Sequence, residues 1–150
     1  MIVYRITTEK YSKNLSSSGA PNRWNNEGEQ VIYSAESRSL ASLEMVVHRA
    51  SIKPTLKYKV LVIDIDIPKS QISKIDIGKL PINWRSISAY SYLQEMGSDW
   101  YLKKKKLLLQ IPSSIIPQEK NYIINVKHDL FEEKVKILDI ETYFWDKRLL

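Results

Sequence analysis

The sequence has 150 residues, 43% of them apolar and 27% charged, with a formal net charge of +6, which suits one compact domain over residues 1–150 that attracts anions. The absence of cysteine excludes disulfides, thiolate nucleophiles and cysteine-ligated zinc, and the positions of the four glycines exclude the phosphate loops of Rossmann and P-loop proteins. Two histidines are too few for a three-histidine site; a His–carboxylate site stays possible by count, but we expect no bound metal.

The first segment, residues 2–6, is expected to form a strand because β-branched and aromatic residues dominate it, and this places Arg5 on a rigid element. The chain shows no signal-peptide pattern, and no apolar run approaches the roughly 20 residues of a membrane span, so we expect a cytoplasmic protein. Residues 7–30 are polar, which predicts a long loop that contains Arg23. A short strand over residues 31–33 follows.

A helix is predicted next, over residues 37–50, with Ser34 or Ser37 as a candidate N-cap. On a helical wheel its apolar stripe consists of Leu40, Leu43, Val47 and Ala50. Glu44 lies about 40° from Leu40, at the edge of this stripe. A carboxylate in that place is unusual for a side chain that only faces solvent, so Glu44 is a candidate for chemistry.

The clearest strand covers residues 57–67. Apolar side chains recur at every second position in this segment, and a proline lies on either side of it. Two of its residues, Asp64 and Asp66, could be proposed as a metal pair. Without a third ligand in view, they fit a solvated strand face better.

The second half of the chain begins with a loop-like stretch over residues 69–85, followed by a helix predicted over residues 86–96 and closed by Gly97. Three further strands are predicted over residues 107–111, 121–126 and 134–140. The run of four lysines at 103–106 fits a solvated turn better than a nucleic-acid site, because no recognition helix accompanies it.

Four side chains on or beside these elements could carry chemistry. Arg5 and Arg23 offer planar forks of N–H donors, and two such arginines could hold one diphosphate. Tyr33 offers a flat face for a base or a nicotinamide ring, and Glu44 can stabilise an oxocarbenium-like cation. With the corner at 112–114, these residues would suit cleavage of the N-glycosidic bond of a nucleotide. The residue types permit this site without selecting it, since surface ion pairing and core packing would also account for them.

Short motifs in one order along nearly the whole chain add to this interpretation. They are Tyr4-Arg5, Asn22-Arg23-Trp24-Asn25, Val31-Ile32-Tyr33-Ser34-Ala35, Leu40-Ala41-Ser42-Leu43-Glu44 with His48, Trp84, Gly97-Ser98-Asp99-Trp100, Ile111-Pro112-Ser113-Ser114, Asn121-Tyr122-Ile123-Ile124-Asn125 with His128, and the segment 144–149. In order and spacing this set closely resembles the RES-domain family. One departure is Pro21-Asn22, where the family usually has Gly-Gly, and a proline there stiffens the loop that carries Arg23.

The resemblance implies an α+β fold, with an ADP-ribosyltransferase-like mixed β-sheet core and flanking helices. It implies that the Arg, Glu and Ser of the family name correspond to Arg5, Glu44 and Ser113. Catalytic roles then fall to Glu44, Arg5 and Tyr33, and contacts with NAD to Arg5, Arg23, Tyr33 and Ser113. Three further residues are expected at the site, namely Ser34, His48 and Asn121.

The resemblance also implies a function, that of the toxin of a bacterial toxin–antitoxin pair. Such a toxin degrades NAD, which is its substrate and not a resident cofactor, with water or inorganic phosphate as the acceptor. Its partner is expected to be a helix-turn-helix antitoxin of the Xre type that covers the pocket in a hetero-oligomer and makes any contact with DNA itself. Three alternatives stay open: a protein ADP-ribosyltransferase with the same site, a toxin that has lost its activity, and a basic nucleic-acid-binding module that depends on the lysine run at 103–106.

Overall fold

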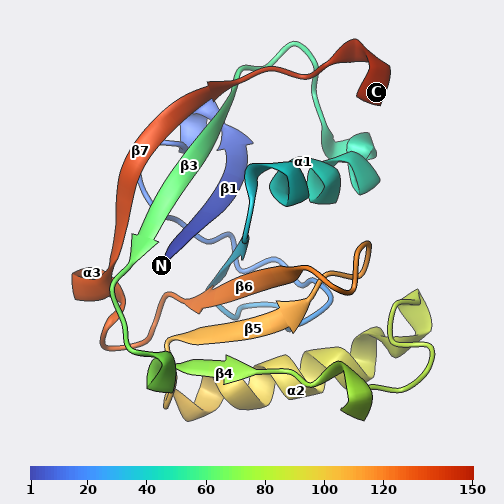
Figure 1. The fold of residues 1–150 in the computed structure, drawn as a ribbon, viewed down its shortest axis with the longest axis vertical. Helices are drawn as coiled ribbons and strands as arrows, with labels where there is room; N and C mark the ends of the chain where they lie inside the picture. Colours follow the sequence, from blue (N-terminus) through green and yellow to red (C-terminus); the bar gives the residue numbers. More distant parts are fainter.

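The computed structural model describes residues 1–150, apart from the side chain of Arg49 (Figure 1). Within these residues, seven strands form one sheet in the order β4-β5-β6-β2-β1-β3-β7. All neighbouring strands are antiparallel except β4 and β5, so the sheet is mixed and the expected α+β fold is confirmed. The strands are β1 (Ile2–Thr8), β2 (Val31–Ala35), β3 (Tyr58–Ile65), β4 (Ile72–Lys74), β5 (Leu108–Pro112), β6 (Lys120–Asn125) and β7 (Val135–Tyr143).

The sheet is split between its central strand, β2, and the neighbouring strand β1. β1 pairs with β3 along its whole length and β2 pairs with β6 along its whole length, but β1 and β2 pair only at Tyr4 and Ala35. Figure 1 shows the result: β1, β3 and β7 form one half of the molecule with α1 (Arg38–Val47), and β4, β5 and β6 form the other with α2 (Tyr90–Lys103). Apart from this one pair, the facing edges of β1 and β2 are therefore not joined by strand pairing.

Helix α1 follows β2 after a two-residue turn, and Ser37 is its N-cap, with a hydroxyl that accepts a hydrogen bond from the Leu40 amide at 3.1 Å. The helix ends at Val47, three residues before the predicted end. The predicted apolar stripe was partly wrong: Leu40 is buried as predicted, but Val47 is 55% exposed, and Ala41, which was outside the predicted stripe, is buried. The reason is that α1 packs through Leu40, Ala41 and Met45 onto β1 and the start of β3, which leaves Val47 beyond the covered part of the sheet.

Helix α2 is the largest departure from the sequence prediction. It begins at Tyr90 and continues through Gly97 to Lys103, so Gly97 lies inside the helix and does not end it. A Cβ on Gly97 would lie 1.7 Å from the carbonyl oxygen of Trp24, which shows that the glycine permits a close approach between the helix and the loop at Trp24. Lys104, with a φ of 50°, forms the left-handed C-cap.

The second half of the sheet packs on α2 through a cluster that contains three tryptophans, Trp24, Trp84 and Trp100. β4 had not been predicted, because its three residues are too short to show alternation; it pairs with β5. A short helix, α3 (Phe131–Lys134), leads into β7. Among the described residues, no helix combines the length and the apolar character that a membrane span requires.

Candidate active site

Two adjoining cavities lie where β1 and β2 separate. The larger has a volume of about 340 Å³ and the smaller about 210 Å³, a combined size in the range of small-molecule sites. Five residues line both cavities, so we describe them as the larger and smaller lobes of one cleft: Asn22, Tyr33, Glu44, His48 and Asn121. The split in the sheet thus creates a site to which both halves of the molecule contribute.

Glu44 stands at the junction of the two lobes, on the face of α1 that borders the sheet. Its Oε1 accepts a hydrogen bond from the Ser113 hydroxyl at 2.9 Å and another from Asn121 Nδ2 at 2.6 Å. In the part of the chain that the structure describes, Oε2 accepts no hydrogen bond from the protein. One carboxylate oxygen is therefore fixed, and the other is left for a ligand.

Ser113 follows β5 and is fully buried. Its Oγ accepts hydrogen bonds from the amides of Ile115 at 3.1 Å and Ile116 at 3.2 Å, so its O–H is directed to Glu44. Ser113 does not line either lobe. The structure gives the Ser113 hydroxyl a contact with Glu44, and the direct contact with NAD expected from the sequence stays a prediction.

Asn121 supplies the second hydrogen bond to Glu44 from β6, where it pairs with Ala35 of β2. Because a carboxylate only accepts hydrogen bonds, the amide nitrogen must face Glu44. The amide oxygen then points away and is buried without a partner, a cost that buried polar groups seldom bear. The amide orientation is thus set by Glu44, as expected for a residue that holds the carboxylate in place.

Tyr33 links the cleft to the loop that carries Arg23. Its hydroxyl donates to Asn25 Oδ1 at 2.7 Å and accepts from the Trp24 amide at 3.2 Å. Burial raises the pKa of the Tyr33 phenol above its ordinary value, and this outweighs the hydrogen bond from Trp24. Tyr33 is therefore neutral near pH 7, and it offers its ring and its hydrogen bonds, not a phenolate base.

Arg23 lies in the larger lobe and is held on two sides. Its Nη1 donates to the carbonyl oxygens of Trp84 at 3.1 Å and Arg85 at 3.0 Å, and its Cζ lies 4.7 Å from the centroid of the Tyr90 ring. These contacts fix the plane of the guanidinium, which favours bidentate binding of an oxyanion.

Arg5 lies in the smaller lobe, on β1. Its Nη1 donates to the carbonyl oxygen of Ser16 at 2.8 Å, and within the described residues no carboxylate forms an ion pair with it. Burial lowers the pKa of Arg5, which reflects the cost of keeping a cation there without a counter-ion. Arg5 and Arg23 thus flank Tyr33 and Glu44 from different lobes, and both could hold one diphosphate only if it lay across the junction.

Two of the remaining expected residues have different surroundings. Ser34 lines the smaller lobe, and its buried hydroxyl donates to the Tyr122 carbonyl oxygen at 2.9 Å, which ties β2 to β6. His48 is exposed at the end of α1 and lines both lobes.

Sequence reasoning missed Arg85, which lines the larger lobe and donates from Nε to the Ser114 carbonyl oxygen at 2.6 Å. No pattern marks Arg85, because it stands in a stretch without regular structure.

The chemistry that the cleft can perform follows from these groups. Among the described residues, no group of three or more His, Cys, Asp or Glu side chains is placed to hold a metal ion. The cleft does bring together one anchored carboxylate, a neutral phenol and three guanidiniums, of which Arg23 and Arg85 line the larger lobe and Arg5 the smaller. Such a set can bind an anionic ligand and stabilise a positive charge that develops beside the carboxylate.

Comparison with known proteins identifies the family of this chain. The RES domain family matches residues 2–146. Toxin Res of Photorhabdus laumondii is 34% identical over 100% of this chain and 97% of its own length, and Toxin Res of Yersinia enterocolitica is 31% identical over 99% of both. A Prs ADP-ribosylating toxin of Sphingobium sp. is 31% identical over 98% of this chain and 95% of its own length. The chain therefore belongs to the RES domain family.

Proposed function

We propose that this chain is a toxin that consumes NAD in the cytoplasm by cleaving the bond between nicotinamide and ribose. The names of the full-length relatives support the toxin role, and one of them is named as an ADP-ribosylating toxin. ADP-ribosylation and NAD hydrolysis share their first chemical event, the loss of nicotinamide. The proposal therefore concerns the one bond that both reactions break.

The observation that carries the proposal is the anchoring of Glu44 at the junction of the two lobes. When the bond between the anomeric carbon and the nicotinamide nitrogen breaks, the electron pair leaves with nicotinamide and the ribose becomes an oxocarbenium-like cation. A carboxylate held beside that carbon stabilises the cation. Because Ser113 and Asn121 fix Oε1, Glu44 needs little reorganisation to meet the charge as it forms.

The acceptor completes the reaction. The oxygen of water, or of inorganic phosphate, bonds to the anomeric carbon and loses a proton, giving ADP-ribose or its 1-phosphate together with nicotinamide. NAD is then a substrate, and no resident cofactor takes part. Arg5 and Arg23 are the groups that we assign to the phosphates, and Tyr33 is the group that we assign to the ring of a base.

The test is NAD consumption by the purified protein, with nicotinamide measured as the product. Glu44→Gln keeps the shape of the side chain but removes its charge, so we expect the rate to fall at least about 100-fold. Glu95→Gln, at an exposed position of α2, is the matched control and keeps the wild-type rate. A Glu44→Gln protein that consumed NAD at the wild-type rate would overturn the assignment.

Ser113 gives a second test of the same site. Because it contacts Glu44 and does not line the cleft, Ser113→Ala should lower kcat about tenfold and change KM for NAD less than about twofold. Ser39→Ala, on the exposed side of α1, serves as the control. A rise in KM without a fall in kcat would instead indicate that Ser113 contacts the substrate.

A protein ADP-ribosyltransferase is the second candidate, because a relative that matches nearly the whole chain is named as an ADP-ribosylating toxin. The two candidates differ only in the acceptor. Incubation of the protein with labelled NAD and a bacterial lysate distinguishes them: labelled protein bands indicate transfer, and free ADP-ribose or its phosphate indicates degradation.

We also propose that the partner is a helix-turn-helix antitoxin of the Xre type that covers the cleft. Support comes from the toxin names of the relatives and from the three guanidiniums that line the cleft, which would attract an acidic segment. A helix-turn-helix protein encoded beside this chain should stop NAD consumption when added in equimolar amount. Continued consumption in a stable complex would contradict a cleft-covering partner.

A further inference from the structure

An ion pair between Arg38 and Glu141 lies next to the smaller lobe, outside the site assigned so far. Arg38, the first residue of α1, donates from Nε to Glu141 Oε2 at 2.8 Å and from Nη2 to Glu141 Oε1 at 2.5 Å. This bidentate pair joins α1 to β7. The same guanidinium lies over the ring of Tyr4 on β1, with its Cζ 4.5 Å from the ring centroid.

Tyr4 connects this pair to the cleft. It lines the smaller lobe together with Tyr33, and it is the β1 residue at which β1 and β2 make their single pairing. Within the described residues β1 and β2 make no other pair, so side-chain contacts hold the Tyr4 ring: it packs against the buried cluster that contains Leu40 and Ala41, and it contacts Arg38. Arg38 covers one face of the ring, and Glu141 fixes the plane of Arg38.

We propose that Arg38, held by Glu141, is a positioning residue that orients the Tyr4 ring as an aromatic wall of the smaller lobe, against which a flat ring of the dinucleotide packs. This inference rests on the proposed function, because it assumes a dinucleotide in the cleft. Arg38 does not line either lobe itself. Its influence must therefore pass through Tyr4.

The solvent exposure of Arg38 and Glu141 indicates that their ion pair positions Tyr4 and does not stabilise the fold. The Arg38 side chain is 52% exposed and that of Glu141 30%, and ion pairs at such positions contribute little to the stability of a protein. Loss of Arg38 should leave the fold intact and loosen Tyr4. The loss should weaken binding of the substrate ring, which appears in KM, and leave the chemistry at Glu44 unchanged, which appears in kcat.

The experiment measures kcat and KM for NAD in Arg38→Gln and Glu141→Gln. We expect KM to rise about three- to tenfold in each, with kcat within about twofold of wild type. Arg148→Gln is the matched control, because Arg148 also forms a bidentate pair, from Nε to Asp146 Oδ1 and from Nη2 to Asp146 Oδ2, but is not among the residues that line the two lobes; KM of this variant should stay at the wild-type value. Arg38→Lys keeps the charge but cannot form the planar bidentate pair with Glu141. Its KM for NAD should therefore lie closer to that of Arg38→Gln than to that of the wild type.

A double variant tests whether the effect passes through Tyr4. In a Tyr4→Ala background, Arg38→Gln should raise KM no further, because the ring that Arg38 holds is absent. An unchanged KM in Arg38→Gln, full recovery in Arg38→Lys, or additive effects with Tyr4→Ala would each overturn the inference while leaving NAD consumption established. A wild-type protein that consumes no NAD would instead overturn the proposed function.

Discussion

At the scale of single residues, the cleft contains side chains that contribute a charge, such as Glu44, and a side chain that contributes a neutral ring and hydrogen bonds, Tyr33. Glu44 keeps one oxygen bound to Ser113 and Asn121 and the other unbound by the protein residues described. Tyr33 contributes no charge, because burial raises its pKa and its hydroxyl is engaged with Asn25 and Trp24. The charged side chains of the cleft are thus Glu44, Arg5, Arg23 and Arg85, a set that can bind an anionic dinucleotide and stabilise a developing cation.

The raised pKa of Tyr33 predicts how stability changes at alkaline pH. A tyrosine whose pKa is higher in the folded than in the unfolded protein stabilises the fold fully below the unfolded value of about 10, and this contribution is lost as the pH rises through the folded value. The free energy of unfolding of the wild type should therefore fall between pH 9 and pH 11 by about 1 kcal/mol more than that of Tyr33→Phe. Urea unfolding at several pH values measures this difference; parallel curves for the two proteins would show that Tyr33 ionises as freely when folded as when unfolded.

At the scale of elements, much of the fold follows from local patterns. Alternating apolar residues predict β3, and the serine at position 37 caps α1 as such residues commonly do. The prediction failed where long-range packing decides the outcome. Gly97 has the local signature of a helix end, yet it lies within α2 because the Trp24 loop packs against it. Arg85 joins the cleft through contacts with residues 114 and 115, which no local pattern could reveal.

The contact at Gly97 predicts a large effect from a small substitution. Gly97→Ala would place a methyl group 1.7 Å from the Trp24 carbonyl oxygen, and since that atom belongs to the backbone, the loop or the helix must move. We expect a loss of about 3 kcal/mol in the free energy of unfolding, although alanine is the better helix former. Ser91→Ala, on the exposed face of α2, is the control and should stay within about 0.5 kcal/mol of wild type. Equal stability of Gly97→Ala and wild type in urea unfolding would contradict this account.

At the scale of the whole molecule, the split between β1 and β2 explains why the site residues are dispersed along the sequence. Arg5 comes from the half of the sheet that carries β1, Asn121 from the half that carries β6, and Glu44 from α1, the helix that packs on the β1 half. A motif search can place each residue on an element. Only the single pairing of Tyr4 with Ala35 shows that the two halves diverge and leave room for a ligand. The cleft is thus a property of the sheet as a whole.

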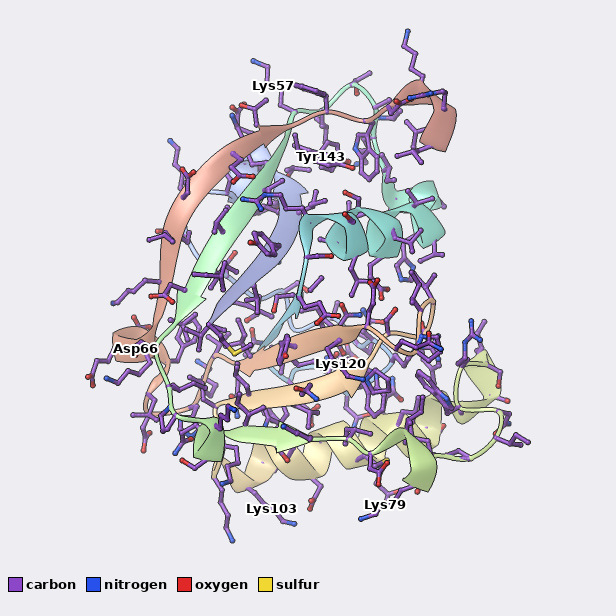
Figure 2. The ribbon with its side chains drawn as sticks, in the orientation of Figure 1. Lys57, Asp66, Lys79, Lys103, Lys120 and Tyr143 are labelled. Atoms are coloured by element: carbon purple, nitrogen blue, oxygen red, sulfur yellow. The ribbon has the colours of Figure 1, made fainter. Side chains whose placement is uncertain are left out.

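The net charge of +6 raises the question of which positive groups matter to function. The lysine run at 103–106 begins at the last residue of α2, a helix of 14 residues whose first residue, Tyr90, lines the larger lobe. At 1.5 Å per residue the run therefore lies about 20 Å from Tyr90, well beyond the Debye length of about 8 Å at physiological salt. Figure 2 shows Lys103 at the edge of the molecule beside α2, away from α1, and Lys103 is paired with Asp99 at 2.7 Å.

Replacing the four lysines at 103–106 with glutamine should accordingly leave kcat/KM for NAD within about twofold of wild type at 0.15 M salt. Growth arrest on expression in bacteria should persist as well, whereas Glu44→Ala should abolish it. This pair of variants separates the two classes of function, because a nucleic-acid-binding module would depend on the lysines and not on a carboxylate in the cleft. Arrest that survived Glu44→Ala and disappeared with the four lysines would favour the nucleic-acid module. The opposite pattern would assign the toxicity to the cleft, where we propose that Arg5 and Arg23 bind the phosphates of the ligand.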